Sequence, residues 1–225
     1  LTQKYFGIPT ETQHWKEWAD SISQYAGERP VVFLSSYQRA SKYSFYSGKT
    51  GFTTTEVGMR KSQFNLWNTE EELQGKQVYV CTNWGLVPTH AINHHHFITP
   101  VLEFDGFVTD SFLSWNKIEI EPMKKNYSVR TGANFSVPVK IFSPYKNHPC
   151  PNNSSRITYR IYNNKFQKLG DYEAGVLLSN VLCQGETEIK IQAPDSMGEY
   201  KAFISAAQDN FPPPVNSPAI DVTVK

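Results

Sequence analysis

The spacing of apolar residues changes near residue 105, and this change constrains the fold more than any other feature of the sequence. Before it, helix-like and strand-like patterns alternate. After it, apolar and polar residues alternate in short runs, which is the pattern of half-buried strands. The sequence therefore predicts two domains, one over residues 1–105 and one over residues 106–225. A total of 225 residues suits two small domains.

The first half carries helical stripes separated by strand-like runs. Trp15, Trp18 and Ile22 recur at helical spacing, so a helix is expected over residues 12–26. Further helices are expected over residues 37–46 and 69–73, and strands over residues 30–34, 52–55, 77–81 and 101–104. This order predicts a small Rossmann-like α/β domain of three layers, with helices on the faces of a parallel or mixed sheet.

The second half reads as strands separated by turns. Alternating runs occur at residues 117–121, 135–142, 156–162, 187–192, 200–205 and 220–224. Six or seven strands in this length predict an immunoglobulin-like or fibronectin-like β-sandwich. Tyr200 stands just before such a strand, at the tyrosine-corner position of these folds. The Cys–Trp–Cys core of antibody domains is absent from the sequence.

Charge and hydropathy argue against several partners. The net charge is +1, from 22 basic and 21 acidic residues, so no strong field attracts nucleic acid or an anionic membrane. No apolar run approaches the roughly 18–20 residues that span a bilayer. We expect no transmembrane span and no signal peptide. Because the chain begins at Leu1, we expect a mature protein or a piece of a longer one.

Cofactor motifs and cysteines are sparse. Neither a GxGxxG nor a GxxxxGK[ST] turn occurs, so no dinucleotide or P-loop cofactor is predicted. Cys81 lies in an apolar run and is predicted to be a buried free thiol. Cys150 and Cys183 both lie near predicted strand ends, and a disulfide between them stays open.

A histidine cluster raises the question of a metal site. Its members are His90, His94, His95 and His96. Neutral imidazoles are good zinc or copper ligands. Pro88, Asn93 and Pro100 flank the cluster, however, and no carboxylate stands at the HExxH spacing. We therefore favour a solvated loop over a native metal site.

The best candidate for ligand binding follows the first predicted strand, because ligands in open α/β sheets bind at the carboxyl ends of strands. Aromatic rings and forked donors suit sugars or phosphates. The predicted binding residues are Tyr37, Gln38, Lys42 and Tyr43, with Arg60 and Gln63 reaching the same crevice. The alternative is an ordinary helix whose Tyr43 and Tyr46 pack on the sheet while Arg39 and Lys42 face water. No nucleophile–base pair stands out, so no catalytic residue is predicted.

These segments resemble one protein class. The resemblance covers roughly residues 10–105 and rests on residues 14–19, 26–33, 36–48, 60–67 and 73–78. They are similar to the region following the membrane domain in bacterial glycosyltransferases of the dolichyl-phosphate-mannose–protein mannosyltransferase type. The second half resembles the tail of the same proteins only loosely.

The resemblance implies an accessory role outside the cytoplasm. Such enzymes take a sugar from a polyprenyl-phosphate carrier, and their catalytic carboxylate lies in a membrane-domain loop that this chain lacks. It implies a soluble region at the periplasmic face of the bacterial inner membrane, which supports its own membrane domain or receives an acceptor, a glycan or the lipid-linked sugar. The alternatives are a non-catalytic protein–protein interaction module of a cell-envelope protein and a stand-alone hydrolase.

Overall fold

The structure, a computed structural model, divides into two compact units. It describes residues 14–83, 87–88, 91–145, 155–208 and 211–225. The first unit comprises the chain up to residue 54 and residues 62–113, and the second comprises residues 55–61 and 114–225. The boundary inferred from the sequence, between residues 105 and 106, falls inside the strand β5 (Glu103–Thr109).

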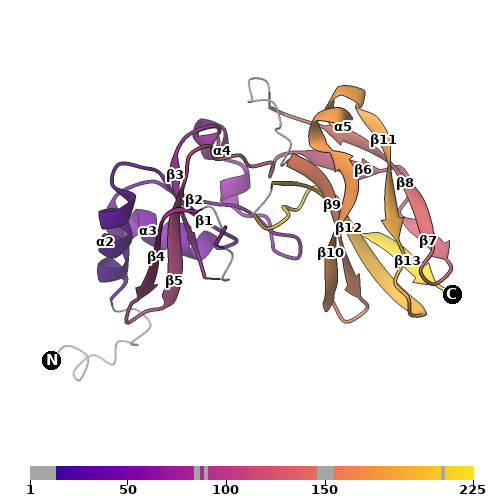
Figure 1. Ribbon diagram of the computed structural model, residues 1–225, viewed down its shortest axis with the longest axis horizontal. Helices are drawn as coiled ribbons and strands as arrows, with labels where there is room; N and C mark the ends of the chain where they lie inside the picture. The colour runs from indigo at the N-terminus through magenta and orange to yellow at the C-terminus, as the bar shows by residue number, and fades with distance from the viewer. Residues whose placement is uncertain (1–13, 84–86, 89–90, 146–154, 209–210) are drawn as a thin grey trace. The chain divides into compact units, whose positions relative to one another are not determined.

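A five-stranded mixed sheet organises the first unit (Figure 1). Its order is β2 (Gly51–Thr53), β1 (Val31–Phe33), β3 (Val78–Thr82), β5 and β4 (Ile92–Ile98). β1 runs parallel to β2 and to β3, whereas β5 runs antiparallel to β3 and to β4. The carboxyl ends of three parallel strands therefore meet at one edge of this sheet.

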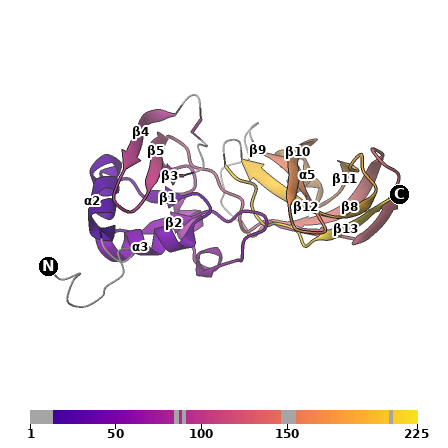
Figure 2. The same cartoon turned by 90° about the horizontal axis from the view of Figure 1, so that it is seen from below.

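Two helices in mutual contact cover one face of this sheet (Figure 2). They are α2 (Trp15–Ala26) and α3 (Tyr37–Ser47). The ring of Trp18 on α2 contacts the rings of Tyr43 on α3 and Phe33 on β1. Gly51 allows the close approach of α3, because a Cβ there would lie 2.8 Å from the Ala40 carbonyl oxygen.

The opposite face is covered differently. Phe52 of β2 contacts Phe64 on the 3-10 turn η2 (Gln63–Asn65) and Phe112. The remaining helix described in this unit, α4 (Thr69–Leu73), has five residues. This face therefore lacks the layer of packed helices that a three-layer domain needs.

The predicted Rossmann-like three-layer class is wrong. Of the described residues, 43% lie in strands and 19% in helices, and the strands form three sheets. The physical reason lies after β3, where an antiparallel strand pair, β4 and β5, takes the place of further strand–helix–strand crossovers. Local patterns had suggested each helix and strand up to that point, but antiparallel pairing depends on contacts that those patterns do not encode.

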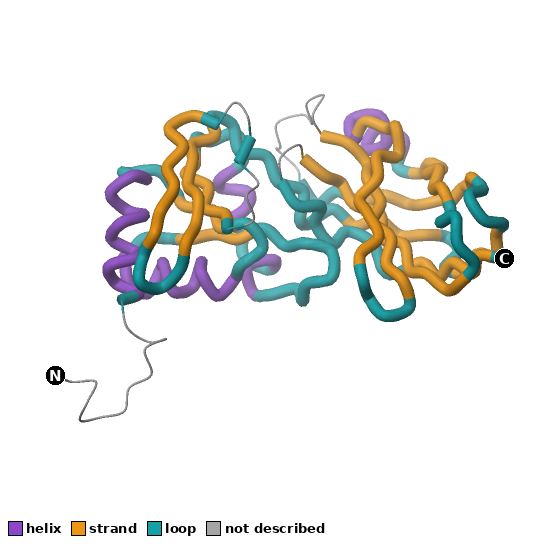
Figure 3. The backbone as a smooth tube through the Cα atoms, turned by 60° about the horizontal axis from the view of Figure 1, so that its bottom comes forward, coloured by secondary structure: helices purple, strands orange, loops and turns teal. Residues whose placement is uncertain are grey.

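The described part of the second unit holds two sheets and one helix (Figure 3). The larger sheet orders β10 (Lys168–Leu177), β9 (Ser155–Asn163), β12 (Gly198–Gln208), β13 (Ile220–Val224) and β7 (Asn126–Val129). The smaller orders β11 (Glu186–Gln192), β8 (Asn134–Phe142) and β6 (Glu119–Pro122), and the helix is α5 (Leu178–Gln184). β7 pairs with β13 in parallel, and the other pairings are antiparallel.

The burial pattern of these strands agrees with a β-sandwich. In β8, Val137, Val139 and Ile141 are buried and alternate with more exposed residues. Five of the six alternating runs expected from the sequence lie wholly in strands, and the sixth, residues 117–121, overlaps β6 from residue 119 onward. The Tyr200 hydroxyl donates to the Ser196 carbonyl oxygen at 3.0 Å, which is the tyrosine-corner arrangement.

Three further expectations concern a membrane span and the cysteines. Within the described ranges, no helix combines the length and the apolarity that crossing a bilayer requires. The predicted buried free thiol at Cys81 is confirmed, and burial raises its pKa. Cys183 is an exposed free cysteine on α5, and Cys150 lies outside the described residues.

Candidate functional site

The turn between β1 and α3 has an uncommon backbone. Ser35 has a φ of 53°, a left-handed conformation that few non-glycine residues adopt. The Ser36 amide donates to Thr53 Oγ1 at 3.0 Å, which fastens the turn to the end of β2. The Ser35 Oγ is buried, and it has no hydrogen-bond partner among the residues that the structure describes. The strained conformation and this hydroxyl both lie where ligands bind in related sheets.

The first turn of α3 offers hydrogen-bond donors. Ser36 is the N-cap residue, but its side chain makes no capping hydrogen bond. In the described part of the chain, the amides of Tyr37, Gln38 and Arg39 have no acceptor. Uncapped amides at a helix N-terminus carry a partial positive charge and favour an anion.

Arg39 adds a full positive charge to the same turn. Its Nη1 donates to the neutral Asn83 Oδ1 at 2.5 Å, and no carboxylate among the described residues pairs with it. The side chain is half-buried, and this burial lowers the pKa of the guanidinium although the group stays charged. An arginine that is partly desolvated and lacks a counter-ion is suited to hold an external anion.

Two of the six predicted binding residues lie in this first turn. Tyr37 and Gln38 are exposed there, and Tyr37 keeps 45% of its surface accessible. Tyr43 is fully buried, and its hydroxyl lies 3.2 Å from Ser23 Oγ. It therefore packs in the core rather than binding a ligand, as the alternative interpretation of this helix predicted. The Lys42 ammonium lies 3.5 Å from the centre of the Trp15 ring.

Arg60 and Gln63, the other two predicted binding residues, belong to different units. Both are exposed. Arg60 belongs to the stretch 55–61 of the second unit, whereas Gln63 begins η2 in the first unit. Gln63 therefore shares its unit with the other four predicted residues, and Arg60 does not.

Sequence reasoning overlooked Ser35, Thr53 and Asn83 and did not select Arg39. One signal was available, because paired serines directly after a buried strand and before a helix mark the strand–turn–helix connection. Asn83 follows β3, and only the pairing of β1 with β3 brings it near Arg39. Its role was not visible in the local pattern.

The histidine cluster is a strand, not the predicted loop. His94, His95 and His96 belong to β4, the edge strand beside β5, and His90 lies outside the described residues. Alternation places His94 and His96 on one face of β4. His94 Nε2 and His96 Nδ1 both lie within hydrogen-bonding distance of Asp105 Oδ1, at 2.9 and 3.0 Å.

The electrostatics of this cluster link histidine and carboxylate. The hydrogen bond with Asp105 raises the pKa of His96, and Glu103 Oε1 lies 3.0 Å from His96 Nε2. Partial burial alone would raise the pKa of Asp105, but hydrogen bonds from His94 and His96 lower it overall. The protonated imidazole and the ionised carboxylate therefore stabilise each other.

The comparisons with protein families and with curated proteins found no match. The resemblance to the membrane glycosyltransferases therefore stays a prediction.

Proposed function

We propose that this chain is an accessory region of a polyprenyl-phosphate-sugar-dependent membrane glycosyltransferase, at the periplasmic face of the bacterial inner membrane. Its first unit binds a sugar that bears a phosphate, at the N-terminus of α3. The chain itself holds the ligand, and the bond-making carboxylate belongs to the membrane domain. This role follows the resemblance over residues 10–105.

The observation that carries the proposal is the Arg39 guanidinium, which has no carboxylate partner among the described residues and lies in the uncapped first turn of α3. Three amides without acceptors point the same way, because a phosphate oxygen accepts hydrogen bonds from such amides. The guanidinium adds charge-assisted hydrogen bonds. The exposed Tyr37 ring, next in sequence to the N-cap, offers an apolar surface to a sugar ring.

A matched pair of variants tests this site. Arg39→Gln removes the guanidinium at the first turn of α3. Lys42→Gln removes a positive charge from the same helix, but from a side chain whose ammonium lies over the Trp15 ring. We expect the full chain to bind a hexose 1-phosphate in isothermal titration calorimetry. Arg39→Gln weakens that binding by about tenfold, the equivalent of one charge-assisted hydrogen bond. Lys42→Gln leaves the affinity within about twofold, because α3 binds the phosphate through its first turn.

Two outcomes would contradict the proposal. One is the absence of hexose 1-phosphate binding by the wild-type chain. The other is an equal loss in both variants, which would indicate a diffuse response to net charge. Far-ultraviolet circular dichroism of each variant establishes that the fold is retained, so that a loss of affinity is assigned to the site.

Exposed apolar residues favour a second candidate, a protein–protein interaction module. Leu66 and Trp67 are adjacent in sequence and expose 81% and 48% of their surfaces. Neighbouring exposed apolar side chains are typical of contact surfaces. A photo-crosslinking residue in place of Trp67 tests this candidate in cells, where it predicts a discrete crosslinked protein species. A probe that crosslinks to no protein there would reject it.

A further inference from the structure

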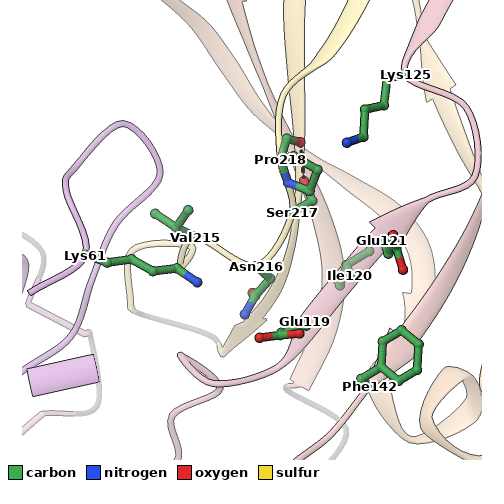
Figure 4. A pocket seen from close by; sticks show the side chains of 10 residues that line it. All are labelled: Lys61, Glu119, Ile120, Glu121, Lys125, Phe142, Val215, Asn216, Ser217 and Pro218. Atoms are coloured by element: carbon green, nitrogen blue, oxygen red, sulfur yellow. Dashed lines mark hydrogen bonds between the residues drawn. The ribbon is translucent and has the colours of Figure 1, made fainter. Parts of the chain in front are cut away.

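A pocket in the second unit lies apart from the site on α3. Its volume is about 490 Å³, and residues of β6, β8 and the segment 215–218 surround it (Figure 4). Every residue that lines it belongs to the second unit. A volume of this size is in the range of pockets that hold small ligands.

Hydrogen bonds fix the floor of the pocket. Asn216 is buried, and its side-chain amide donates to the carbonyl oxygens of Trp115 and Ile118, both at 2.8 Å. Its Oδ1 accepts from the Ala206 amide at 2.7 Å, and its carbonyl oxygen accepts from the Ile120 amide at 2.9 Å. A floor held by four hydrogen bonds needs little reorganisation when a ligand enters.

The rim carries two acids and two bases. Glu119 and Glu121 are exposed on one face of β6, on either side of the buried Ile120. Lys61 and Lys125 reach toward the segment 215–218 from opposite sides (Figure 4). Over the described ranges, none of these four side chains forms an ion pair. Both donors and acceptors are therefore available to a ligand.

An aromatic ring completes the rim. Phe142 ends β8, pairs with Glu119 across the two strands and keeps 51% of its surface exposed. A carboxylate next to an exposed aromatic ring can accept hydrogen bonds from hydroxyl groups while the ring contacts the apolar face of a sugar. Because the two acids balance the two bases, the pocket does not favour a net charge on its ligand.

We propose that this pocket binds a neutral saccharide. The sugar ring lies on Phe142, its hydroxyl groups donate to Glu119 and Glu121, and they accept from Lys61 and Lys125. Hydroxyl groups serve as donor and acceptor alike, so one uncharged ligand can satisfy side chains of both signs. This inference does not depend on the phosphate site of the first unit, because it uses different residues and a different ligand charge.

Titration with neutral disaccharides tests the pocket. The probes are maltose, cellobiose and mannobiose, measured against the full chain by saturation-transfer nuclear magnetic resonance. Phe142→Ala removes the ring, and the matched control, Phe166→Ala, removes another exposed phenylalanine of the same unit, with 61% of its surface accessible. We expect at least one disaccharide to bind, Phe142→Ala to weaken that binding by about tenfold or more, and Phe166→Ala to leave it unchanged.

Additional measurements distinguish saccharide binding in this pocket from ionic binding and from binding at the site on α3. High salt leaves the affinity unchanged, because the ligand carries no charge. Arg39→Gln also leaves it unchanged, so a failure of the phosphate site is distinguished from a failure of this pocket. The inference is overturned if no probe binds, if Phe142→Ala binds as well as the wild type, or if a zwitterionic dipeptide binds there in place of the saccharides.

Discussion

Asp105 lies within hydrogen-bonding distance of two imidazoles, and this single carboxylate makes the stability of the first unit depend on pH. The pKa of His96 is raised from 6.5 in the folded chain. Its contribution to stability is therefore complete below about pH 6.5 and is lost as pH rises through the raised folded value. The pKa of Asp105 is lowered from 3.8, so its contribution is lost as pH falls through the lowered folded value.

The resulting prediction concerns His96→Asn. Urea unfolding should show a lower free energy of unfolding for the variant at pH 5, where the imidazole of the wild type is protonated and Asp105 is ionised. At pH 9 the two proteins should differ little, because the wild-type imidazole is neutral. In an Asp105→Asn background, the loss of unfolding free energy that His96→Asn causes at pH 5 should be smaller, and Glu103, 3.0 Å from His96 Nε2, accounts for the part that remains. A variant whose deficit is the same at both pH values would show that the pair does not couple to folding.

Single residues also show where sequence reasoning reaches its limit. Ala40 and Tyr43 are three apart on α3, so helical spacing puts both on one face, and the structure buries both. Arg39 and Lys42 are both basic and lie three positions apart on α3, so the local pattern does not show which of them lies at the sheet edge. The difference between them comes from the strand pairing, which brings Asn83 near Arg39 at the sheet edge. Lys42 lies over the Trp15 ring instead.

At the level of elements, strong amphipathic patterns were reliable. The helices α2, α3 and α4 and the alternating strands lie where the sequence predicts them. The helix α5 was missed because only Leu178 and Val181 are buried among its seven residues, too few to form a stripe. β10 was missed because its ten residues are mostly exposed and do not alternate. Edge strands and short helices carry weak sequence signals.

A buried arginine on β9 connects the stretch 55–61 to the rest of the second unit. Arg160 is 3% exposed and makes a two-pronged ion pair with Asp171. Its Nη1 also donates to Glu56 at 2.8 Å and to the Val57 carbonyl oxygen at 3.0 Å. Glu56 is 104 positions away in sequence, so no local pattern could have revealed this contact.

Arg160→Ala should destabilise the protein by about 3 kcal/mol, because it removes the buried cation that pairs with both Glu56 and Asp171. Lys168 still pairs with Asp171, and the Tyr162 hydroxyl still donates to the Val57 carbonyl oxygen. The measurement is the urea midpoint of unfolding. Lys201→Ala is the control, since it breaks an ion pair with Asp221 whose side chains are 35% and 55% exposed. That change should cost less than about 1 kcal/mol. Equal midpoints for the two variants would refute a stabilising role for Arg160.

At the level of the whole molecule, the sequence predicted two halves of different texture, and the structure has two units. Their composition in strands and helices differs from the predicted α/β class, because the antiparallel pair β4–β5 completes the first sheet. The position of the candidate site at the carboxyl ends of the strands was predicted, but not all of its residues were. The parallel strands β1, β2 and β3 still bring their carboxyl ends to one edge, and the residues there were only partly foreseen.

The central claim is that the first turn of α3 binds the phosphate of a sugar ligand. Backbone amide resonances of the full chain, followed during titration with a hexose 1-phosphate, test it most directly. We expect saturable shifts of the Tyr37, Gln38 and Arg39 amides with the phosphate ester, and none with the free hexose. Saturation without shifts at these three amides, or equal shifts with the free hexose, would contradict the account.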